Sequence, residues 1–182
     1  MAALPNAPSL VSVEEYLSTS YEPEVEFVDG VLVDRGMPTE LHGIFQLLLG
    51  AYLLSFSEQF GFAVSSETRT EVVKRRRYRV PDIVVAPVPV EEGVITRVPW
   101  IIIEINSPGD RIGNMMTRFQ DLESMGVRHV LWVDPIEKTL HCYRNGALRT
   151  EPAVIDLELP TGVLRFDLQS VFEQLDRSRG RA

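Results

Sequence analysis

The sequence predicts an α/β fold in which a mixed β-sheet is flanked by helices, with a further helix and a β-hairpin at the N-terminal end. Residues 100–105 form an almost wholly apolar run, which is typical of a central strand covered on both faces. Residues 41–56 place apolar side chains at intervals of three and four positions, which predicts a helix that packs against such a sheet. The chain has 182 residues, a length at which one domain with one sizeable core is the expected organisation.

The N-terminal part of the predicted fold starts with a short helix. Ser12 is followed three positions later by Glu15, which is the spacing of a capping box, so a helix should begin directly after Ser12. Residues 25–33 then form two alternating apolar runs on either side of Asp29-Gly30. Because Asp-Gly is a strong signal for a two-residue turn, this segment predicts a β-hairpin.

A long helix and two strands are expected next. Thr39 can cap a helix that runs from Glu40 to about Phe60, with Gly61 just past its end. Residues 68–73 and 79–86 are rich in strand-forming side chains, and a basic cluster between them would form the connecting turn.

The rest of the chain continues with strands and helices. The predicted elements are, in order, a helix over 113–125 that ends at Gly126, strands over 128–133 and 138–144 joined by a turn at Asp134-Pro135, and a strand followed by a helix capped near Asp167 within 157–174. We expect residues 1–10 and 177–182 to be flexible tails of the single domain.

Composition argues against several classes of protein. No apolar run approaches the roughly 20 residues that a membrane helix needs, and no secretion signal is visible near the N-terminus, so we expect a cytoplasmic protein with no membrane partner. Cys142 is the only cysteine, which excludes an intramolecular disulfide and argues against a thiolate metal site. It lies in an alternating segment and is interpreted as a strand residue rather than a reactive thiol.

The charge of the chain bears on nucleic-acid binding. A formal net charge of -8 is unfavourable for long-range attraction to DNA, because affinity for DNA comes largely from neutralising phosphates. A local basic cluster can still steer a polyanion. The cluster consists of Lys74, Arg75, Arg76, Arg77 and Arg79. The solvated tip of a hairpin is the commoner role for such a cluster, and a nucleic-acid-binding site is the alternative.

Two carboxylates lie where a surface position is hard to reconcile with their neighbours. Asp82 directly precedes the apolar residues 83–85, and Glu104 lies inside the apolar run of residues 100–105. A carboxylate in an apolar strand must be hydrogen-bonded, paired or bound to a metal ion, because burying it alone is very costly. If the two strands are neighbours, both acids can offer the oxygen ligands that Mg²⁺ prefers. Equally compatible with the spacing are buried ion pairs with arginines such as Arg79 or Arg118.

The order and spacing of several short motifs resemble a known family. These motifs are the acid-turn stretch Glu26-Phe27-Val28-Asp29-Gly30-Val31-Leu32, then His42, Pro81-Asp82, Ile103-Glu104-Ile105-Asn106-Ser107-Pro108 with Asp110-Arg111, Gly126-Val127, and Leu131-Trp132-Val133-Asp134-Pro135. On these motifs the chain resembles the Uma-type family of restriction endonuclease-like proteins, a branch of the PD-(D/E)XK nuclease superfamily, from about residue 11 to residue 172.

The resemblance implies a fold, a cofactor and an activity. It implies a restriction-endonuclease-like core, dependence on Mg²⁺ or Mn²⁺, and hydrolysis of phosphodiester bonds in DNA. Asp82 and Glu104 match the two acids that hold the metal ion in the family. Glu26 matches a third acid that would bind the ion or orient water, although an exposed hairpin glutamate is the alternative. His42 would face the same cleft, either as a proton shuttle or as a polar contact.

This sequence departs from the family pattern at three positions. Asn106 stands where the parent pattern has a lysine, and Leu122 stands where an aromatic residue is usual. Arg118 aligns with the lysine that family members bring from the following helix. Arginine can stabilise negative charge on a phosphate, but it cannot act as a general base, because its pKa stays above about 12. Our hypothesis is therefore that Arg118 stabilises the phosphate while His42 or Glu26 places the attacking water.

Two other function classes are compatible with the sequence. A catalytically inactive member of the same fold could bind nucleic acid or another protein, which Arg118 and the acidic net charge favour. A structural module could instead self-associate through its apolar strands, including residues 131–133, although Trp132 is expected in the core. For a nuclease that acts on both strands of a duplex, a homodimer is expected.

Overall fold

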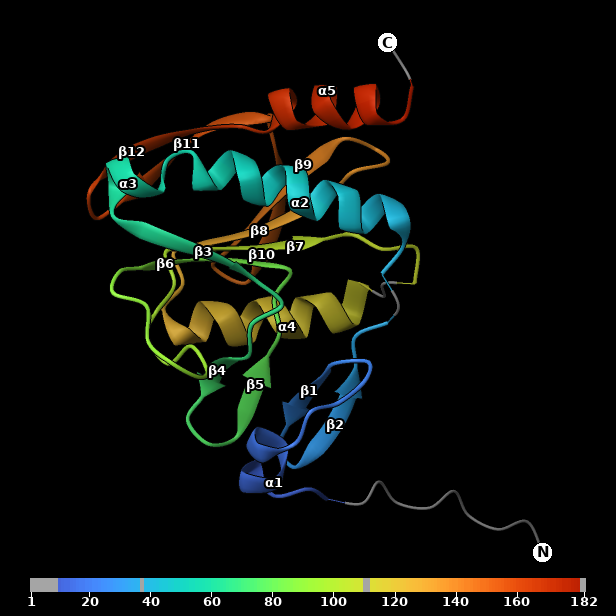
Figure 1. The fold of residues 1–182 in the computed structure, drawn as a ribbon, viewed down its shortest axis with the longest axis vertical. Coiled ribbons are helices and arrows are strands. Elements are labelled where there is room, and N and C mark those ends of the chain that lie inside the picture. The colour runs from blue at the N-terminus through green and yellow to red at the C-terminus, as the bar shows by residue number, and fades with distance from the viewer. Residues whose placement is uncertain (1–9, 37, 110–111, 181–182) are drawn as a thin grey trace, which may run out of the picture.

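A six-stranded mixed β-sheet forms the centre of the molecule (Figure 1). The structure is a computed structural model that describes residues 10–36, 38–109 and 112–180. The strand order is β10-β9-β8-β7-β6-β3, and β7 and β8 run parallel whereas the other neighbours pair antiparallel. The strands are β3 (Phe62–Ser66), β6 (Ile83–Pro87), β7 (Ile101–Ile105), β8 (His129–Asp134), β9 (Thr139–Arg144) and β10 (Ala147–Glu151).

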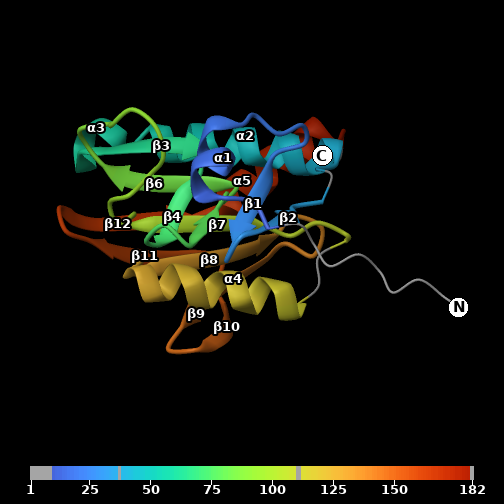
Figure 2. The same cartoon turned by 90° about the horizontal axis from the view of Figure 1, so that it is seen from below.

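Helices cover both faces of this sheet (Figure 2). The helix α4 (Ile112–Met125) connects β7 to β8, as a parallel pair requires a crossover connection, and it lies on one face. The opposite face carries α2 (Glu40–Leu54) and α5 (Leu168–Ser178). The mixed sheet flanked by helices that the sequence predicted is confirmed.

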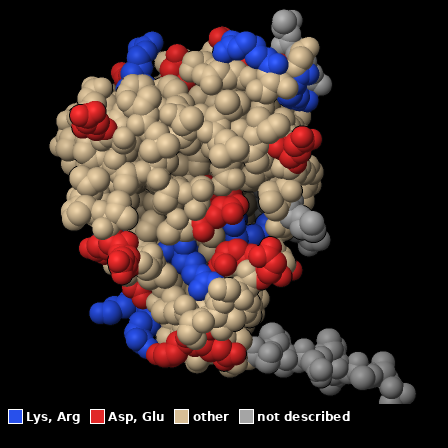
Figure 3. Space-filling view, in the orientation of Figure 1, with Lys and Arg blue, Asp and Glu red and all other residues tan. Residues whose placement is uncertain are grey.

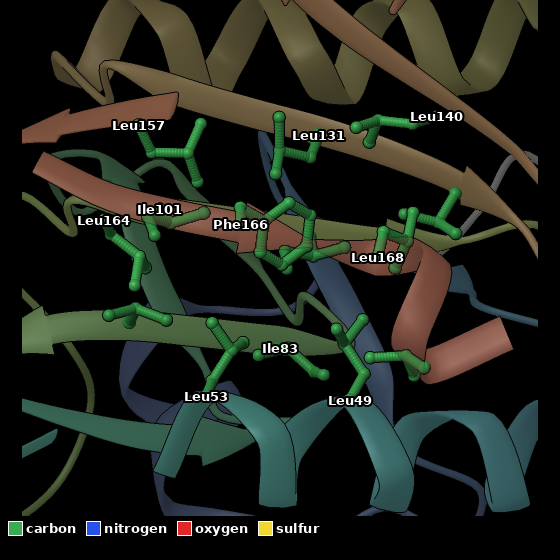
Figure 4. Packing of buried hydrophobic residues seen from close by; sticks show 14 of the residues in the cluster. Leu49, Leu53, Ile83, Ile101, Leu131, Leu140, Leu157, Leu164, Phe166 and Leu168 are labelled. Carbon is green, nitrogen blue, oxygen red and sulfur yellow. The ribbon is translucent and has the colours of Figure 1, made fainter. Parts of the chain in front are cut away.

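The hydrophobic core is divided by the sheet into two layers. In the layer below α2, Leu49 and Leu53 point toward Ile83 of β6 (Figure 4). In the layer between α4 and the sheet, Phe119 packs with Ile102 of β7. Successive residues of a strand face opposite sides of a sheet. All five residues of β7 are buried for this reason, so the predicted central strand is confirmed.

A smaller unit lies below the central sheet in Figure 1. It contains α1 (Val13–Ser18) and a four-stranded sheet of order β2-β1-β5-β4, with β1 (Val25–Val28), β2 (Val31–Asp34), β4 (Thr70–Val73) and β5 (Arg77–Arg79). The Ser12 hydroxyl accepts the N–H of Glu15 at 3.1 Å, as the capping-box spacing predicted. Asp29 and Gly30 have φ angles of 50° and 93°, which is the pair of positive values that a tight hairpin turn needs.

The long helix predicted from Glu40 to Phe60 is wrong in its extent. The helix α2 ends at Leu54, and a separate turn, α3 (Ser57–Phe60), follows it. Ser55 and Ser57 donate their hydroxyl groups to carbonyl oxygens of the last turn of α2, at 2.7 and 2.8 Å. These side chains take over acceptors that a continuing helix would have used.

The strand predicted over residues 79–86 is also two elements. The strand β5 ends at Arg79 in the small sheet, and β6 begins at Ile83 in the central sheet. Pro81 lies between them and has no N–H to donate to a strand ladder. The strands predicted over 128–133 and 138–144 are confirmed as β8 and β9, with Cys142 as a strand residue. The strands β3 and β10 were not predicted.

The C-terminal part contains one strand more than predicted. A hairpin of β11 (Val154–Leu159) and β12 (Gly162–Asp167) precedes α5, and Asp167 caps that helix by accepting the N–H of Ser170 at 3.2 Å. The helix α5 extends to Ser178, so the first two residues of the tail predicted over 177–182 are helical. Residues 1–9 of the tail predicted over 1–10, and residues 181–182, lie outside the described residues. None of the helices in the described part of the chain has the length and apolar character needed to cross a membrane.

Candidate active site

Two acids face each other across neighbouring strands of the central sheet. The strands β6 and β7 pair antiparallel, with Ile83 opposite Ile103. Extending this register by one position sets Asp82 opposite Glu104, and residues that face each other across strands project from the same side of a sheet. The backbone N–H of Ile105 also donates a hydrogen bond to Asp82 Oδ2 at 2.7 Å. The two acid-bearing segments are therefore neighbours, which is the condition under which the sequence predicts a shared metal site.

Asp82 is buried and surrounded by hydrogen-bond donors. Arg35 Nη2 lies 2.9 Å from Asp82 Oδ1, and His42 Nε2 lies 3.4 Å from the same oxygen. Burial alone would raise the pKa of Asp82. The interactions with His42, the Ile105 N–H and Arg35 together lower this pKa below its ordinary value, so Asp82 is ionised at neutral pH.

Glu104 has the opposite electrostatic character. Its exposed fraction is 1%, and its Oε1 atom lies 3.0 Å from Arg118 Nη2. That oxygen accepts no hydrogen bond from any residue that the structure describes. Burial raises the pKa of Glu104 to about 8, and although Arg118 lowers it, the negative charges of Asp82 and Glu26 raise it further. Glu104 is therefore mainly protonated at neutral pH.

The two acids thus have pKa values moved in opposite directions. Asp82 is ionised and Glu104 retains a proton, so the pair carries a single negative charge at neutral pH. Neighbouring titratable groups whose pKa values are driven apart are characteristic of sites that bind metal ions or transfer protons. This electrostatic pattern supports a functional interpretation of the pair.

Glu26 is part of a buried ion network and is not an exposed hairpin residue. Its exposed fraction is 2%, which contradicts the surface alternative. Arg79 Nη1 lies 2.7 Å from Glu26 Oε2, and Arg118 Nη2 lies 3.0 Å from Glu26 Oε1. Arg79 Nη2 also contacts Asp121 Oδ2 at 2.5 Å. Sequence reasoning missed Asp121, although its position three residues after Arg118 places both on one face of α4.

His42 lies at the start of α2, next to Asp82. Thr39 caps this helix by accepting the N–H of His42 at 3.2 Å. The ring of His42 is held from both sides, with Nδ1 3.0 Å from Ser107 Oγ and Nε2 near Asp82. Gln46, one turn later, donates to the backbone carbonyl of Asp82 at 2.8 Å. The start of α2 therefore fixes the position of Asp82.

A cavity of about 470 Å³ opens beside the acids. Arg35, Arg79, Arg118 and Glu26 form part of its wall. Its other polar lining residues include Thr39, Ser107, Asn114 and Thr117. Basic and acidic side chains gather at the level between the small unit and the central sheet, whereas the middle of the face above them is free of charge and further charged side chains lie along its edges (Figure 3). Asp82 and Glu104 are not among the lining residues, and the cavity is linked to them through Arg35 and Arg118, which line it and contact the two acids.

The basic cluster forms the β4–β5 hairpin, which confirms its predicted place at a hairpin tip. Its three tip arginines have acidic partners, with pairs Arg75–Glu14, Arg76–Asp29, Arg77–Asp29 and Arg77–Asp121. Lys74 is exposed and forms no ion pair with the described residues. Arg79 points inward and lines the cavity, so it lies apart from the surface of the tip. A role of the cluster in nucleic-acid binding stays a prediction.

The departures from the family pattern have clear structural positions. The side-chain amide of Asn106 donates to Asp134 Oδ2 at 2.6 Å, so it ties the ends of β7 and β8 together. Leu122 is fully buried in the core below α4. Arg118, which aligns with the lysine of the family, contacts Glu104.

The donor set suits a hard divalent cation. Mg²⁺ is commonly held by one or two carboxylates, with waters and phosphate oxygens completing its shell. Asp82 and Glu104 supply such carboxylates, and Glu104 Oε1 has spare acceptor capacity among the described residues. No three Asp, Glu, His or Cys side chains within the described ranges converge as a ready-made metal cage. Asp82 and Glu104 can therefore hold a divalent ion once the guanidinium groups of Arg35 and Arg118 have turned away from their carboxyl oxygens.

Known proteins resemble this chain in sequence and fold. A family model described as "Uma2: Putative restriction endonuclease" matches residues 13–172. The crystal structure of a protein from Anabaena variabilis, described as a putative nuclease belonging to DUF820, gives a TM-score of 0.73 at 24% identity, covering 91% of this chain and 99% of that chain. A cryo-EM structure of a DrdV–DNA complex gives a TM-score of 0.40 at 14% identity over 78% of this chain and 12% of that chain, which does not establish a common fold. Curated proteins gave no match. The likeness to the Anabaena protein confirms the predicted fold class.

Proposed function

The chain belongs to the Uma2 family, described as putative restriction endonucleases, and on this basis we propose that it is a metal-dependent endonuclease that hydrolyses phosphodiester bonds in DNA. Asp82 and Glu104 would hold the Mg²⁺ or Mn²⁺ ion. One observation carries the proposal: two buried acids lie at adjacent positions, Asp82 directly before β6 and Glu104 on β7, one ionised and one protonated, and the arginines that contact them line a cavity.

The cavity suits a phosphate group. Arg35, Arg79 and Arg118 line it, and guanidinium groups bind phosphate oxygens through paired N–H donors. Its volume of about 470 Å³ leaves space for a sugar-phosphate segment of a nucleic acid. The chemistry of the lining therefore favours a polyanionic substrate in spite of the negative charge of the whole chain.

The residues of the chain have separate roles in this proposal. A divalent ion held by the two acids would polarise the phosphodiester and lower the pKa of a water molecule. Arg118 would donate hydrogen bonds to the phosphate oxygen on which negative charge develops. His42, whose ring is fixed by Ser107, would orient the attacking water. Glu26 is already paired with Arg79 and Arg118, so we assign it to positioning Arg118.

Cleavage of supercoiled plasmid DNA tests this proposal. The purified chain should nick or linearise the plasmid with Mn²⁺ or Mg²⁺ and should be inactive with a chelator. Asp82→Asn should abolish cleavage, because it removes the charge of one metal ligand. Asp156→Asn is the matched control, since Asp156 is an exposed acid on β11, and it should cleave as the wild type does. Equal cleavage by the Asp82→Asn protein would refute the proposal.

A second candidate function is supported by a specific observation. Both acids already have a guanidinium partner, Arg35 for Asp82 and Arg118 for Glu104, so both can stay buried without a metal ion. A catalytically inactive protein that binds nucleic acid or another protein would show this arrangement. Calorimetric titration with Mn²⁺ distinguishes the two functions, because absence of binding, or binding that Glu104→Gln leaves unchanged, would support the inactive protein.

The quaternary structure also belongs to the proposal. A homodimer would place two sites in two-fold symmetry and so suit cleavage of both strands of a duplex. Analytical ultracentrifugation of the full chain, with and without duplex DNA, measures this directly.

A further inference from the structure

Arg35 contacts Asp82, and beyond its place in the wall of the cavity it has been given no role of its own. It follows β2, and its side chain is 12% exposed. Its Nη2 atom lies 2.9 Å from Asp82 Oδ1, and its Nη1 atom lies 3.7 Å from Glu67 Oε1. Sequence reasoning did not select this residue, because neither its neighbours nor its spacing marks it.

The guanidinium group of Arg35 has donors to spare. Its Nε atom is buried and has no hydrogen-bond partner among the residues that the structure describes. Arginine carries several N–H donors in a planar fork that matches the oxygens of a phosphate. Arg35 also lines the cavity beside the acids. A buried and incompletely satisfied guanidinium group at a cavity wall points to an anionic ligand.

Arg35 also occupies the oxygen that a metal ion would need. Asp82 Oδ2 accepts the backbone N–H of Ile105, so Oδ1 is the oxygen that can turn to a cation without loss of that bond. Arg35 lies against Oδ1. A divalent cation and a guanidinium group at one carboxylate oxygen repel each other, so the ion and Arg35 compete for Asp82.

We propose that Arg35 is a phosphate-binding residue that serves as the counter-ion of Asp82 until a divalent ion replaces it. The displaced guanidinium group then turns to the cavity and binds the phosphate of the substrate, while Glu67 stays within reach as a partner for its other edge. Metal ion and phosphate therefore bind cooperatively. This inference rests on the metal site of the proposed function.

Cooperativity of this kind is reciprocal. If the phosphate ligand raises the affinity for the metal ion, the metal ion raises the affinity for the phosphate ligand by the same factor. Coupling between two sites typically amounts to about 5–150-fold in affinity. In the Arg35→Met protein, the ion would no longer compete with a guanidinium group for Asp82 Oδ1, which keeps His42 as its neighbour, and the phosphate would lose its ligand.

The test is calorimetric titration of Mn²⁺ into the full chain, with and without thymidine 5′-monophosphate, a phosphate ligand that contains no diester to cleave. For the wild type, the nucleotide should tighten Mn²⁺ binding by about 5-fold or more. Arg35→Met should bind Mn²⁺ more tightly than the wild type in the absence of nucleotide, and the effect of the nucleotide should disappear. Arg149→Met, a change at an exposed arginine of β10, should behave as the wild type does.

The outcomes separate the two proposals. If Arg35→Met binds Mn²⁺ as the wild type does and keeps the effect of the nucleotide, Arg35 has no such role, although the metal site stands. If neither the wild type nor Arg35→Met binds Mn²⁺, the metal site itself is refuted, and the inference with it. Arg35→Gln, which removes the charge but keeps a donor, gives the same comparison if Arg35→Met does not fold.

Discussion

The guanidinium group of Arg118 lies 3.0 Å from Glu104 Oε1, so a cation supplied by α4 lies directly against the acid of β7. The same nitrogen lies 3.0 Å from an oxygen of Glu26. One side chain thus contacts two buried carboxyl groups, and a buried carboxyl group without a partner would be costly. This bridging position accounts for both the stability and the proposed chemistry of the site.

Arg118→Met should lower the rate of DNA cleavage by about 10²-fold or more, because it removes the donor to the charged phosphate. Binding of Mn²⁺ should persist, since neither metal ligand changes. Plasmid nicking measures the first effect and calorimetry the second. Arg118→Lys should keep more activity than Arg118→Met. Wild-type cleavage by Arg118→Met would show that Arg118 has no part in the reaction.

Arg79→Met should destabilise the protein by about 1.5–3 kcal/mol, because two buried acids lose the hydrogen bonds from their shared partner and each keeps one other arginine. Those acids are Glu26 and Asp121. Urea denaturation followed by circular dichroism measures the change in the free energy of unfolding. Arg149→Met is the surface control and should change stability by less than about 0.5 kcal/mol. A similar small change for Arg79→Met would mean that the network does not stabilise the fold.

The main lines of this fold could be predicted because they depend on local chemistry. Alternation around Asp29-Gly30 and the cap at Thr39 act within a few residues, and both are found in the structure. The break after Leu54 depends on two serine hydroxyl groups that compete for carbonyl oxygens, a choice that apolar periodicity does not reveal. The hairpin of β11 and β12 turns at Pro160-Thr161, and the proline there is a turn signal that the predicted single strand did not take into account.

Glu104 should make the stability of the metal-free protein depend on pH. Its pKa is raised from 4.5 to about 8, so the folded protein holds a proton that the unfolded chain has lost. The free energy of unfolding should therefore decrease, on this account, as pH rises from about 4.5 through about 8. The free energy of unfolding of the Glu104→Gln protein should decrease less steeply with pH, and at about pH 9 it should exceed that of the wild type.

Urea denaturation at a series of pH values, in the presence of a chelator, checks this dependence. Asp156→Asn is a suitable control, because it replaces an exposed acid of β11 and should follow the wild type. Parallel curves for the wild type and Glu104→Gln would show that Glu104 does not carry the proton.

Lys74 should contribute to DNA binding more than its arginine neighbours at the hairpin tip. It forms no ion pair with the described residues, whereas Arg76 lies 2.6 Å from an oxygen of Asp29. Lys74→Gln should reduce the slope of log affinity against log salt concentration by about 0.9, the value for one lost phosphate contact. Arg76→Gln should change the slope less. Fluorescence anisotropy with a labelled duplex measures both, and unchanged slopes would exclude the tip from the DNA contact.

The site was predictable where single residues conflict with their surroundings. A glutamate inside an apolar strand and an aspartate directly before one could be selected from the sequence. Arg35 and Asp121 could not, because they reach the site only through the packing of the small unit and α4 against the sheet. The sequence alone did not decide whether Asp82 and Glu104 would pair with arginines or bind a metal ion. The structure pairs both acids with arginines and leaves a cavity beside them.

The hydrogen bond from Ile105 to Asp82 comes from the main chain, and every amino acid except proline supplies such an N–H. The side chain at position 105 can therefore be exchanged for another that fills the same space, and the distance between the two acids does not change. Related proteins can therefore carry different apolar side chains at position 105 and keep the hydrogen bond that holds Asp82.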